Sequence, residues 1–494
     1  FSIRNQFKTA ISTLKAANYL KEELLEYQIE FFNNSKLEGR KKKEKAILFG
    51  NQKDISSTFK LVDILKTHNI KIHNLKKDIK INGKKFAIEN SFVVPLNQEK
   101  FKVIQAIFNK QKKFTDSTFY DVSSWTIPLA FDVNFEKIND INLIGKVIEN
   151  DKKIVIKNLK KADYAYLFET HGYYYPKALY KLLDYGLRAK VSMKKFKINN
   201  KSFDYGTIMI PTHNQNLNPN EIHKILSEVS VTSELNIYGT NTGASQAGID
   251  LGSRNFKTIK KPKIGLLVGD GVRSYDAGEI WYMMDRQYNI PITKIDTRIL
   301  ERLNLEKYTH FIFPSFTGDL SSKTLNKIKS WIEKGGTLIL YREAIKWAKR
   351  NHLIEIEIIE NELIAENVDF VDRINFKKAQ SISGAIFKAN LDRTHPINFG
   401  IENNSISLFR NTDIFIKPDN ESYNNPIKYD KNPLISGYTS KENLKTLSNT
   451  VPFKIQSIEN GRVIIMTDNT NFRGYWIGTQ QFLANMIFYS NFMN

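Results

Sequence analysis

The chain has 494 residues, more than one hydrophobic core normally holds, so at roughly 150 residues per domain we expect about three domains. It contains no cysteine, which excludes disulfides, thiolate metal sites and a cysteine nucleophile. The formal net charge is +21, but the basic residues are spread along the whole chain without a nucleic-acid-binding module, so we expect no nucleic-acid partner.

The first segment, residues 2–32, is predicted to form one long amphipathic helix, because apolar residues such as Ile3 and Phe7 recur on one stripe. The polar residues 33–35 are expected to end it, and the lysine-rich segment 36–45 reads as a solvated linker. No strand precedes this helix, so the natural partner of its apolar face is expected to be missing. The chain also begins without Met or a leader, and we expect it to be processed or truncated.

Residues 46–150 are predicted to form a first α/β unit. A buried strand, a helix and a second strand are followed by a hairpin with a primed turn at Asn82-Gly83, then a strand ending in proline and a helix. These elements are expected at residues 46–49, 57–67, 70–72, 79–86, 92–95 and 98–108.

Residues 151–262 repeat this plan as a second unit. Its expected elements are residues 165–168, 178–183, 189–191, 198–203, 208–211 and 219–229. Between the two units lies an aromatic connection, residues 114–131, which we interpret as an ordered loop that packs, with a groove lining as the alternative.

Residues 263–494 are predicted to form the third unit. Strands are expected at residues 264–268, 290–295, 311–314, 337–340 and 461–466, with helices at 276–288, 321–333 and 479–492 and irregular chain over 341–450. The predicted fold class is therefore α/β, with three repeated flavodoxin-like or amidotransferase-like units, mainly parallel sheets, and a preceding amphipathic helix.

The loop after the first strand of this unit, Gly269-Asp270-Gly271, nearly matches a dinucleotide-binding fingerprint, with Asp296 placed as the ribose-binding acid. Ser274 replaces the third glycine, and Asp270 puts a negative charge where a pyrophosphate would lie. We therefore interpret the loop as a tight turn whose glycines adopt positive φ. Asp270, Arg273 and Glu279 remain the residues to test first for a ligand.

Two further patterns bear on catalysis and metal binding. Ser315, in the turn after the 311–314 strand, is a candidate nucleophile, but His395 is the only distant histidine to activate it. His352 and Glu355 have a metal-ligand spacing within what reads as alternating surface charge, so we expect no metal and no cofactor in this chain.

Polar and aromatic side chains follow two other strands. The loop that contains Glu169, His171 and Tyr173 comes directly after the first strand of the second unit, where open α/β sheets bind ligands. Arg473 follows the 461–466 strand, and we expect it to pair with Asp468 or Asp270. The tentative ligand-binding residues are therefore Glu169, His171, Tyr173, Asp270, Arg273, Glu279, Ser315 and Arg473.

Four stretches together carry a family resemblance that covers nearly the whole chain: FTDSTFYDVSSWTIPLAFDV, LFETHGYYYPKALYKLLDYGLRAKV, PKIGLLVGDGVRSYDAGEIWYMMD and DNTNFRGYWIGTQQFLANMIFY. They resemble the C-terminal region of exported zinc carboxypeptidase-like proteins of Bacteroidetes-type bacteria. In that family a peptidase domain comes first, and the last domain is similar to class I glutamine amidotransferases. The resemblance implies that residues 1–35 hold the last helix of the peptidase domain.

What the resemblance implies is an accessory region without catalysis. The family's zinc ligands would all precede Phe1, so zinc is expected only in a preceding peptidase domain, and the amidotransferase-like domain lacks the family's cysteine. The expected role is to position the peptidase, which would pack on helix 2–32, or to bind peptide or cell-envelope ligands. The alternatives are an interaction subunit of an envelope complex and a serine hydrolase at Ser315. An exported location is expected, without a transmembrane segment.

Overall fold

The computed structural model describes residues 1–115, 122–148, 154–361 and 365–493. The chain divides into two compact units, each held together by contacts among its own residues. The first comprises Phe1–Gln52, Thr58–Asn109 and Asn134–Lys152, and the second Lys53–Ser57, Lys110–Val133 and Lys153–Asn494. Among the helices of the described part, none is long and apolar enough to cross a membrane.

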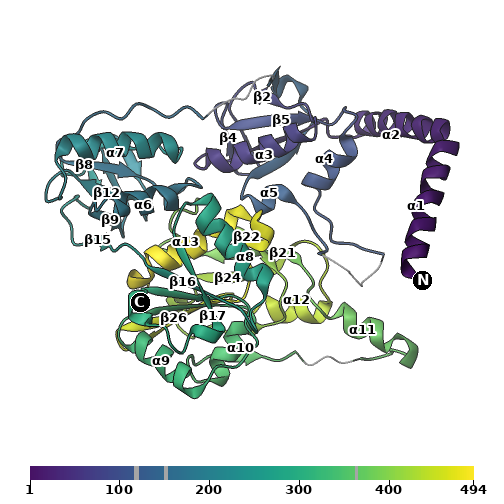
Figure 1. Ribbon diagram of the computed structural model, residues 1–494. Coiled ribbons are helices and arrows are strands. Elements are labelled where there is room, and N and C mark those ends of the chain that lie inside the picture. The colour runs from purple at the N-terminus through teal and green to yellow at the C-terminus, as the bar shows by residue number, and fades with distance from the viewer. Residues whose placement is uncertain (116–121, 149–153, 362–364, 494) are drawn as a thin grey trace. The chain divides into compact units, whose positions relative to one another are not determined.

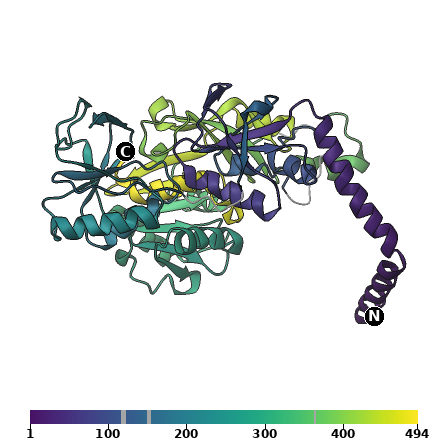
Figure 2. The same cartoon turned by 90° about the horizontal axis from the view of Figure 1, so that it is seen from above.

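The first unit begins with two helices, α1 (Ser2–Tyr19) and α2 (Lys21–Lys41), where the sequence predicted one. The helix breaks at Leu20, whose backbone has φ −94° and ψ 19°, and both views show the chain changing direction there (Figures 1 and 2). The predicted end at residues 33–35 and the linker at 36–45 were wrong. Helix α2 runs on to Lys41, because Gly39 lets it lie against the Leu96 backbone, where a Cβ would come within 2.0 Å of a carbonyl oxygen.

Apolar side chains on α1 and α2 remain exposed within the described structure. No residue of α1 is buried, and in α2 only Ser35 and Gly39 are. The exposed apolar residues include Ile3, Phe7, Ile11, Leu14, Leu24, Leu25, Ile29 and Phe31. The apolar stripe seen in the sequence therefore has no covering partner among the described residues.

The rest of the first unit is a five-stranded sheet with the order β6-β1-β5-β2-β7, next to a two-stranded hairpin, β3-β4. Every described strand pair in this sheet is antiparallel. The elements are β1 (Ala46–Gly50), α3 (Ile55–Thr67), β2 (His73–Leu75), β3 (Ile79–Ile81), β4 (Lys84–Phe86), β5 (Ser91–Pro95), α4 (Phe101–Phe108), β6 (Asn134–Ile138) and β7 (Ile144–Val147).

The second unit contains a sheet with an equivalent order, β13-β8-β12-β9-β15, and its described pairs are also antiparallel. In both sheets the strand that ends in proline lies at the centre, between the first two strands of its plan. The elements are β8 (Ala165–Phe168), α6 (Tyr175–Asp184), β9 (Ala189–Ser192), β10 (Phe196–Ile198), β11 (Lys201–Phe203), β12 (Ile208–Pro211), α7 (Pro219–Thr232), β13 (Tyr238–Thr240), β14 (Ala247–Gly248) and β15 (Phe256–Ile259).

The prediction of mainly parallel sheets was therefore wrong for the first two sheets. The proline-ended strand turns back between its neighbours, since a hairpin rather than a helical crossover precedes it. The primed turn at Asn82-Gly83 is confirmed by φ values of 50° and 80°, and Asn199 and Asn200 form the equivalent turn with φ 49° and 61°.

The third predicted unit has a different topology, because its strands β17-β16-β18-β19-β26 are parallel and β25 is antiparallel at the edge. Helices α9 and α10 cover one face and α8 and α13 the other (Figure 1). The elements are β16 (Ile264–Val268), α8 (Ser274–Trp281), β17 (Ile292–Asp296), β18 (His310–Phe313), α9 (Ser322–Glu333), β19 (Thr337–Tyr341), α10 (Glu343–Arg350), β25 (Phe453–Ile458), β26 (Gly461–Met466) and α13 (Gln480–Phe488).

The predicted helix 276–288 changes form midway. Residues Tyr282–Gln287 continue α8 as a π-helix, a form often found at functional sites. The segment 341–450, predicted to be irregular, contains regular elements. They are β20 (Ile358–Ile359), α11 (Arg373–Ala379), β21 (Ala385–Leu391), β22 (Ser405–Arg410), β23 (Phe415–Ile416), β24 (Ile427–Ser436) and α12 (Lys441–Leu447).

Short helical turns complete the description. The aromatic connection contributes α5 (Ile127–Ala130), while its residues 116–121 lie outside the described residues. The 3₁₀ turns are Ile141–Leu143, Thr297–Ile299, Leu305–Lys307, Phe370–Asp372, Pro396–Asn398, Ser422–Asn424, Phe472–Gly474, Ile477–Thr479 and Ser490–Phe492.

Candidate functional site

A pocket lies at the carboxyl edge of the parallel sheet, where the chain leaves β16 and β26. We call it the α8 pocket. Its volume is about 720 Å³, within the range of small-molecule sites. It is lined by Arg273, Ser274, Tyr275, Asp276, Gly278, Glu279, Tyr282, Asn411, Asn469, Phe472, Arg473 and Gly474. The structure thus brings together three of the predicted site residues, Arg273, Glu279 and Arg473, from segments about 200 residues apart.

Two acidic residues, Asp276 and Glu279, line the pocket. The described hydrogen bonds of Glu279 come from uncharged donors. One carboxylate oxygen accepts the backbone N–H of Arg473 at 2.6 Å, and the other accepts the Asn469 side-chain amide at 2.8 Å. Burial raises the pKa of Glu279 to about 7, and these hydrogen bonds only partly offset it. A carboxyl group that changes its charge near neutral pH therefore faces the pocket.

Beneath the pocket, Arg342 forms the turn between β19 and α10. Its φ of 53° and ψ of −122° lie in a region that non-glycine residues rarely adopt. A sharp, strained strand-to-helix turn of this kind is where many α/β enzymes present a catalytic nucleophile. An arginine has no nucleophilic atom, so this turn carries no nucleophile of the usual kind.

The Arg342 side chain is held by a buried ion pair. It donates to the Asp276 carboxylate at 2.7 Å, and both side chains are 8% exposed. It also donates to the Asn411 backbone carbonyl at 3.0 Å. Arg273 lies 3.5 Å from the other oxygen of Asp276, so two guanidinium groups compensate this carboxylate.

The mouth of the pocket is basic and aromatic. The Arg273 side chain is 52% exposed, and Tyr275 and Tyr282 are 77% and 44% exposed. The guanidinium of Arg473 lies 5.1 Å from the ring centre of Trp125 and 5.0 Å from that of Phe472. Exposed aromatic rings beside guanidinium groups offer both flat apolar contact and charge to a ligand.

The predicted pairing of Arg473 with Asp468 or Asp270 was wrong. Asp468 instead pairs with Arg410 at 2.7 Å and accepts the Tyr429 hydroxyl at 2.5 Å. Arg410 and Asp468 side chains are each 1% exposed, so this pair is part of the core. No local sequence pattern indicated this pair, because Arg410 belongs to the segment predicted to be irregular.

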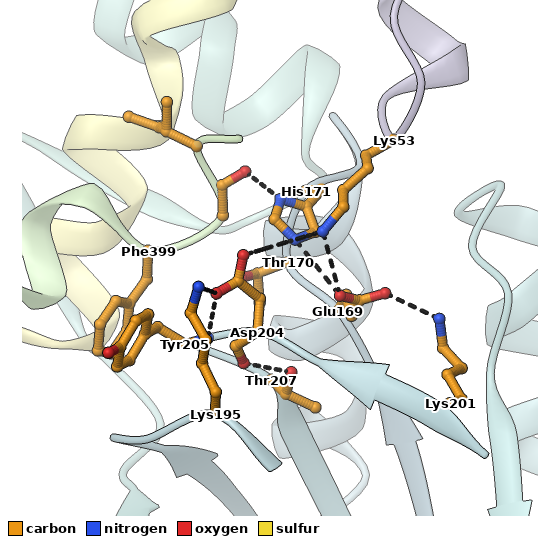
Figure 3. Close-up of polar contacts among 12 residues, drawn as sticks. Lys53, Glu169, Thr170, His171, Lys195, Lys201, Asp204, Tyr205, Thr207 and Phe399 are labelled. Carbon is orange, nitrogen blue, oxygen red and sulfur yellow. Dashed lines mark hydrogen bonds and ion pairs between the residues drawn. The ribbon is translucent and has the colours of Figure 1, made fainter. Parts of the chain in front are cut away.

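A second polar group, which we call the charged cluster, surrounds the loop after β8 (Figure 3). The Lys53 ammonium lies 3.0 Å from His171 Nε2, 3.5 Å from Glu169 and 3.8 Å from Asp204. The two carboxylates also pair with Lys195, Lys201 and Arg393. Two predicted residues, Glu169 and His171, thus lie together, and Asp204 was missed because it comes from the next hairpin.

The contacts of the charged cluster are those of a structural network. His171 Nδ1 lies 2.6 Å from the Gly400 carbonyl, which only accepts, so Nδ1 carries the hydrogen. Nε2 lies 3.0 Å from the Lys53 ammonium and 3.4 Å from the Glu169 carboxylate. Burial alone would raise the pKa of Glu169, but His171, Lys53 and Lys201 hold it well below its usual value. Because Lys53 already supplies the positive charge between His171 and the carboxylates, a metal ion is not needed there.

Tyr173, the third predicted residue of this loop, is a packing residue. It is 6% exposed, its hydroxyl donates to Gln480 at 3.0 Å, and its ring lies 5.4 Å from that of Tyr288. Burial raises the pKa of Tyr173 well above its usual value. Its side chain therefore belongs to the core rather than to a ligand-binding surface.

The glycine loop after β16 is a tight turn, as the sequence predicted. Gly269 and Gly271 have φ values of 97° and 77°, and a Cβ on Gly271 would come within 2.6 Å of Gly318. Asp270 is exposed near Arg298, away from the pocket lining. Asp296 is engaged by Arg298 at 2.8 and 2.9 Å, so the acid at the ribose position is already paired.

Ser315 lies beside the pocket but without an activating base among its described contacts. It is 5% exposed, and its carbonyl accepts the backbone N–H of Arg273 at 2.9 Å. His310 is at the opposite end of β18, roughly 16 Å away at about 3.3 Å per residue, and contacts Ser490 at 3.1 Å. His395 accepts the backbone N–H of Ile397, and burial lowers its pKa to about 4.

Over residues 1–115, 122–148, 154–361 and 365–493, no group of three or more His, Asp or Glu side chains is placed to hold a metal ion. His352 and Glu355 line a second pocket together with Glu357, Asp419 and Glu421 and three lysines. Two of these lysines already pair with its carboxylates, Lys417 with Glu357 at 2.8 Å and Lys454 with Asp419 at 2.5 Å.

Comparisons with known proteins assign no family. No protein-family model matches the chain. No curated protein matches it either. Solved structures that it resembles include a ThuA-like protein from Parabacteroides merdae, with 12% identity over 46% of this chain and 90% of that chain and a TM-score of 0.30.

Two other solved structures that the chain resembles have names unrelated to that of the ThuA-like protein and to each other. A PurLQS structure from Thermotoga maritima is 11% identical over 46% of this chain and 97% of that chain, with a TM-score of 0.31. A β-galactosidase from Bacillus circulans is 8% identical over 60% of this chain and 43% of that chain, with a TM-score of 0.29. Similarities this weak assign neither a function nor a fold family.

Proposed function

We propose that this chain is a non-catalytic ligand-binding region that takes its ligand in the α8 pocket. The observation that carries the proposal is Arg342. It occupies the strained turn where a nucleophile is normally presented, and its side chain is tied to Asp276 at 2.7 Å. A pocket of about 720 Å³ opens directly beside this turn, so binding is retained where the catalytic group is absent.

We propose further that the region is an accessory to a zinc carboxypeptidase-like protein of an exported type, and that the pocket binds peptide or cell-envelope material. The sequence resemblance supports this role. The exposed apolar face of α1 and α2 supports it independently, since Phe7, Leu14 and Leu24 are each at least half exposed. In this proposal the face packs against a peptidase domain, in the same polypeptide or a separate one.

The test of the non-catalytic claim uses the full chain freed of metal with a chelator. The chain is incubated with a mixture of peptides and amide-bearing envelope fragments, and the products are followed by mass spectrometry. We expect no shortening of any peptide. Trimming of C-terminal residues or hydrolysis of any amide would refute the proposal, and hydrolysis that Ser315→Ala abolishes would favour the serine hydrolase alternative.

The test of the accessory role is the intact mass of the native gene product. A mass that accommodates a peptidase domain before Phe1 agrees with the proposal. If the mass equals that of this chain alone, the peptidase must be a separate protein. Complexes purified with the native chain should then contain a peptidase, and a failure to find one would contradict the accessory role.

A second candidate function, an interaction subunit of a larger envelope complex, is favoured by the same exposed face. It differs in one expectation. A purified native chain would carry a stable partner of a different kind even when the α8 pocket is blocked. Recovery of such a partner without any peptidase would favour this candidate.

A further inference from the structure

We propose that the chain binds a second copy of itself through residues 2–31, with α1 of each copy packed antiparallel against α2 of the other. We call residues 2–31 the helical arm. The inference goes beyond the proposed function, because it names what covers the apolar face of the arm when no peptidase domain lies on it. Three features support it: the exposure of the arm, two rows of opposite charge and the geometry of antiparallel helices.

The helical arm has no packing partner within the part of the chain that the structure describes. Every residue from 2 to 31 is exposed, and both views show α1 away from the sheet of its own unit (Figures 1 and 2). Isolated helices are marginal in water, and most helices in proteins are stabilised by the packing of an apolar face. The arm therefore requires a second surface against its apolar side chains.

One apolar stripe runs along both helices of the arm, at about 100° per residue. Its exposed members are Ile3, Phe7, Ile11 and Leu14 in α1 and Leu24, Leu25, Ile29 and Phe31 in α2. The helical hydrogen bonds continue across the bend at Leu20. Its N–H donates to the Ala16 carbonyl at 2.8 Å, and its carbonyl accepts from Leu24 at 2.9 Å. The stripe therefore stays on one side of the arm from end to end.

A row of charged side chains borders the same edge of this stripe in both helices, but with opposite sign. In α1 the row is basic, with residues four and seven apart: Arg4, Lys8 and Lys15. In α2 the row is acidic, with residues four apart: Glu22, Glu26 and Glu30. All six are exposed, and α1 contains no acidic residue. The arm thus has a basic half and an acidic half along a single seam.

Antiparallel packing brings the two rows together. When two helices face each other antiparallel, the same edge of each apolar stripe lies on the same side of the pair, whereas parallel packing puts these edges on opposite sides. Packing α1 against α2 of another copy therefore places the basic row beside the acidic row, where opposite charges attract. Packing α1 against α1, or α2 against α2, places like charges together. Charge complementarity accordingly selects the α1–α2 pairing.

The pairing has to form between copies. Only Leu20 separates α1 from α2, so α1 cannot fold back onto the α2 of its own chain. Two copies that exchange these helices form two equivalent pairs about a two-fold axis near Leu20. An interface of this kind uses the same surface on both chains and is complete at two copies.

The experiment measures the mass of the full chain in solution by sedimentation over a series of concentrations at low salt. We expect a monomer–dimer equilibrium, with a limiting mass of twice the 57.2 kDa of one chain. Replacing two residues of the stripe, with Phe7→Gln and Leu14→Gln, should weaken the dimer without changing any charge, because apolar surface is no longer covered.

Two charge-reversed variants test the pairing itself. The acidic variant makes both rows acidic: Arg4→Glu, Lys8→Glu and Lys15→Glu. The basic variant makes both rows basic: Glu22→Lys, Glu26→Lys and Glu30→Lys. Each variant alone should dimerise at least about tenfold more weakly than the wild type, since like charges then face each other. An equimolar mixture of the two should restore the dimer, because both helix pairs again join opposite charges.

The matched control reverses three exposed lysines of the first unit outside the arm: Lys76→Glu, Lys77→Glu and Lys80→Glu. This control changes the net charge as much as the acidic variant does, and it should dimerise like the wild type. Recovery of the dimer in the mixture would also show that both charge-reversed variants are folded.

Four outcomes overturn the inference. They are a wild-type chain that stays monomeric at every concentration, growth beyond two copies, a mixture of the two variants that does not associate, and a loss of the dimer in the control. A monomeric chain would leave the apolar face to the peptidase domain of the proposed function. None of these outcomes touches ligand binding in the α8 pocket, which fails separately through turnover of peptides or amides in the metal-free assay.

Discussion

Replacing Arg342 by glycine has two opposing effects on the free energy of unfolding. Glycine adopts φ 53° without strain, so the substitution relieves a backbone cost of about 1–3 kcal/mol. It also leaves Asp276 buried without its closer partner, which costs about 3–5 kcal/mol in comparable pairs. Arg273, 3.5 Å from the same carboxylate and half exposed, keeps the loss near the lower end of that range.

We therefore expect Arg342→Gly to destabilise the parallel-sheet domain by about 2 kcal/mol, or about 4–8 °C in melting temperature for a domain of this size. The double variant with Asp276→Asn should recover most of that loss, because no buried charge remains and the strain is still relieved. The assay is thermal unfolding followed by tryptophan fluorescence, since Trp331 and Trp347 are in the core of this domain.

A result that refutes this reasoning is an Arg342→Gly variant at least as stable as the wild type, with Asp276→Asn adding nothing. The ion pair would then contribute no more than the strain it accompanies. Arg350→Gly is an informative control for the loss of an arginine, because Arg350 is exposed at the end of α10 and pairs only loosely, 3.7 Å from Asp319.

Three further predictions follow from buried ionisable groups. Arg410→Leu should destabilise the fold by about 3–5 kcal/mol in urea unfolding, because Asp468 would be left buried without its cation, and Arg410→Leu combined with Asp468→Asn should cost clearly less. The pKa of Glu279 is about 7 in the folded chain and 4.5 in the unfolded chain. The free energy of unfolding should therefore fall as the pH rises from 4.5 to 7, by at most about 3 kcal/mol. The Glu279→Gln variant should lack this pH dependence. For Asp132, burial first and the charges of Asp54 and Glu402 next raise the pKa to about 8, so stability should fall as the pH rises from 3.8 to 8. Asp132→Asn should then be more stable than the wild type at pH 9, since asparagine also accepts the φ of 52°, and an unchanged melting temperature would contradict this.

Local patterns in the sequence predicted most strands, but not how they pair. Ile264–Val268 and Gly461–Met466 were expected and are strands β16 and β26. The direction of pairing in the first two sheets was mispredicted, because buried strands have the same apolar pattern in parallel and antiparallel sheets. The hairpin turn at Asn82-Gly83 was the available sign of an antiparallel arrangement.

The candidate site was predicted only in part, since its residues come together through long-range contacts. Arg273, Glu279 and Arg473 were singled out as strand-end residues, and the structure places all three in one pocket. Arg342 was missed because the helix that follows it was read as irregular chain. A charged residue directly between a strand and a helix was the only signal, and it does not indicate a strained φ.

The most direct test of the ligand-binding claim blocks the α8 pocket without disturbing the fold. Gly278 lines the pocket, and a Cβ there would meet no atom within 4 Å, so Gly278→Phe should fill the cavity at little cost to folding. Gly252→Phe is the matched control, because Gly252 also has open space around it, outside the pocket lining.

The measurement is saturation-transfer NMR of the full chain with the mixture of peptides and amide-bearing envelope fragments used to test for catalysis. We predict a transfer signal for the wild type and for Gly252→Phe, its loss in a folded Gly278→Phe variant, and no change in the ligand over a day. An undiminished signal in Gly278→Phe would place binding elsewhere and contradict the account.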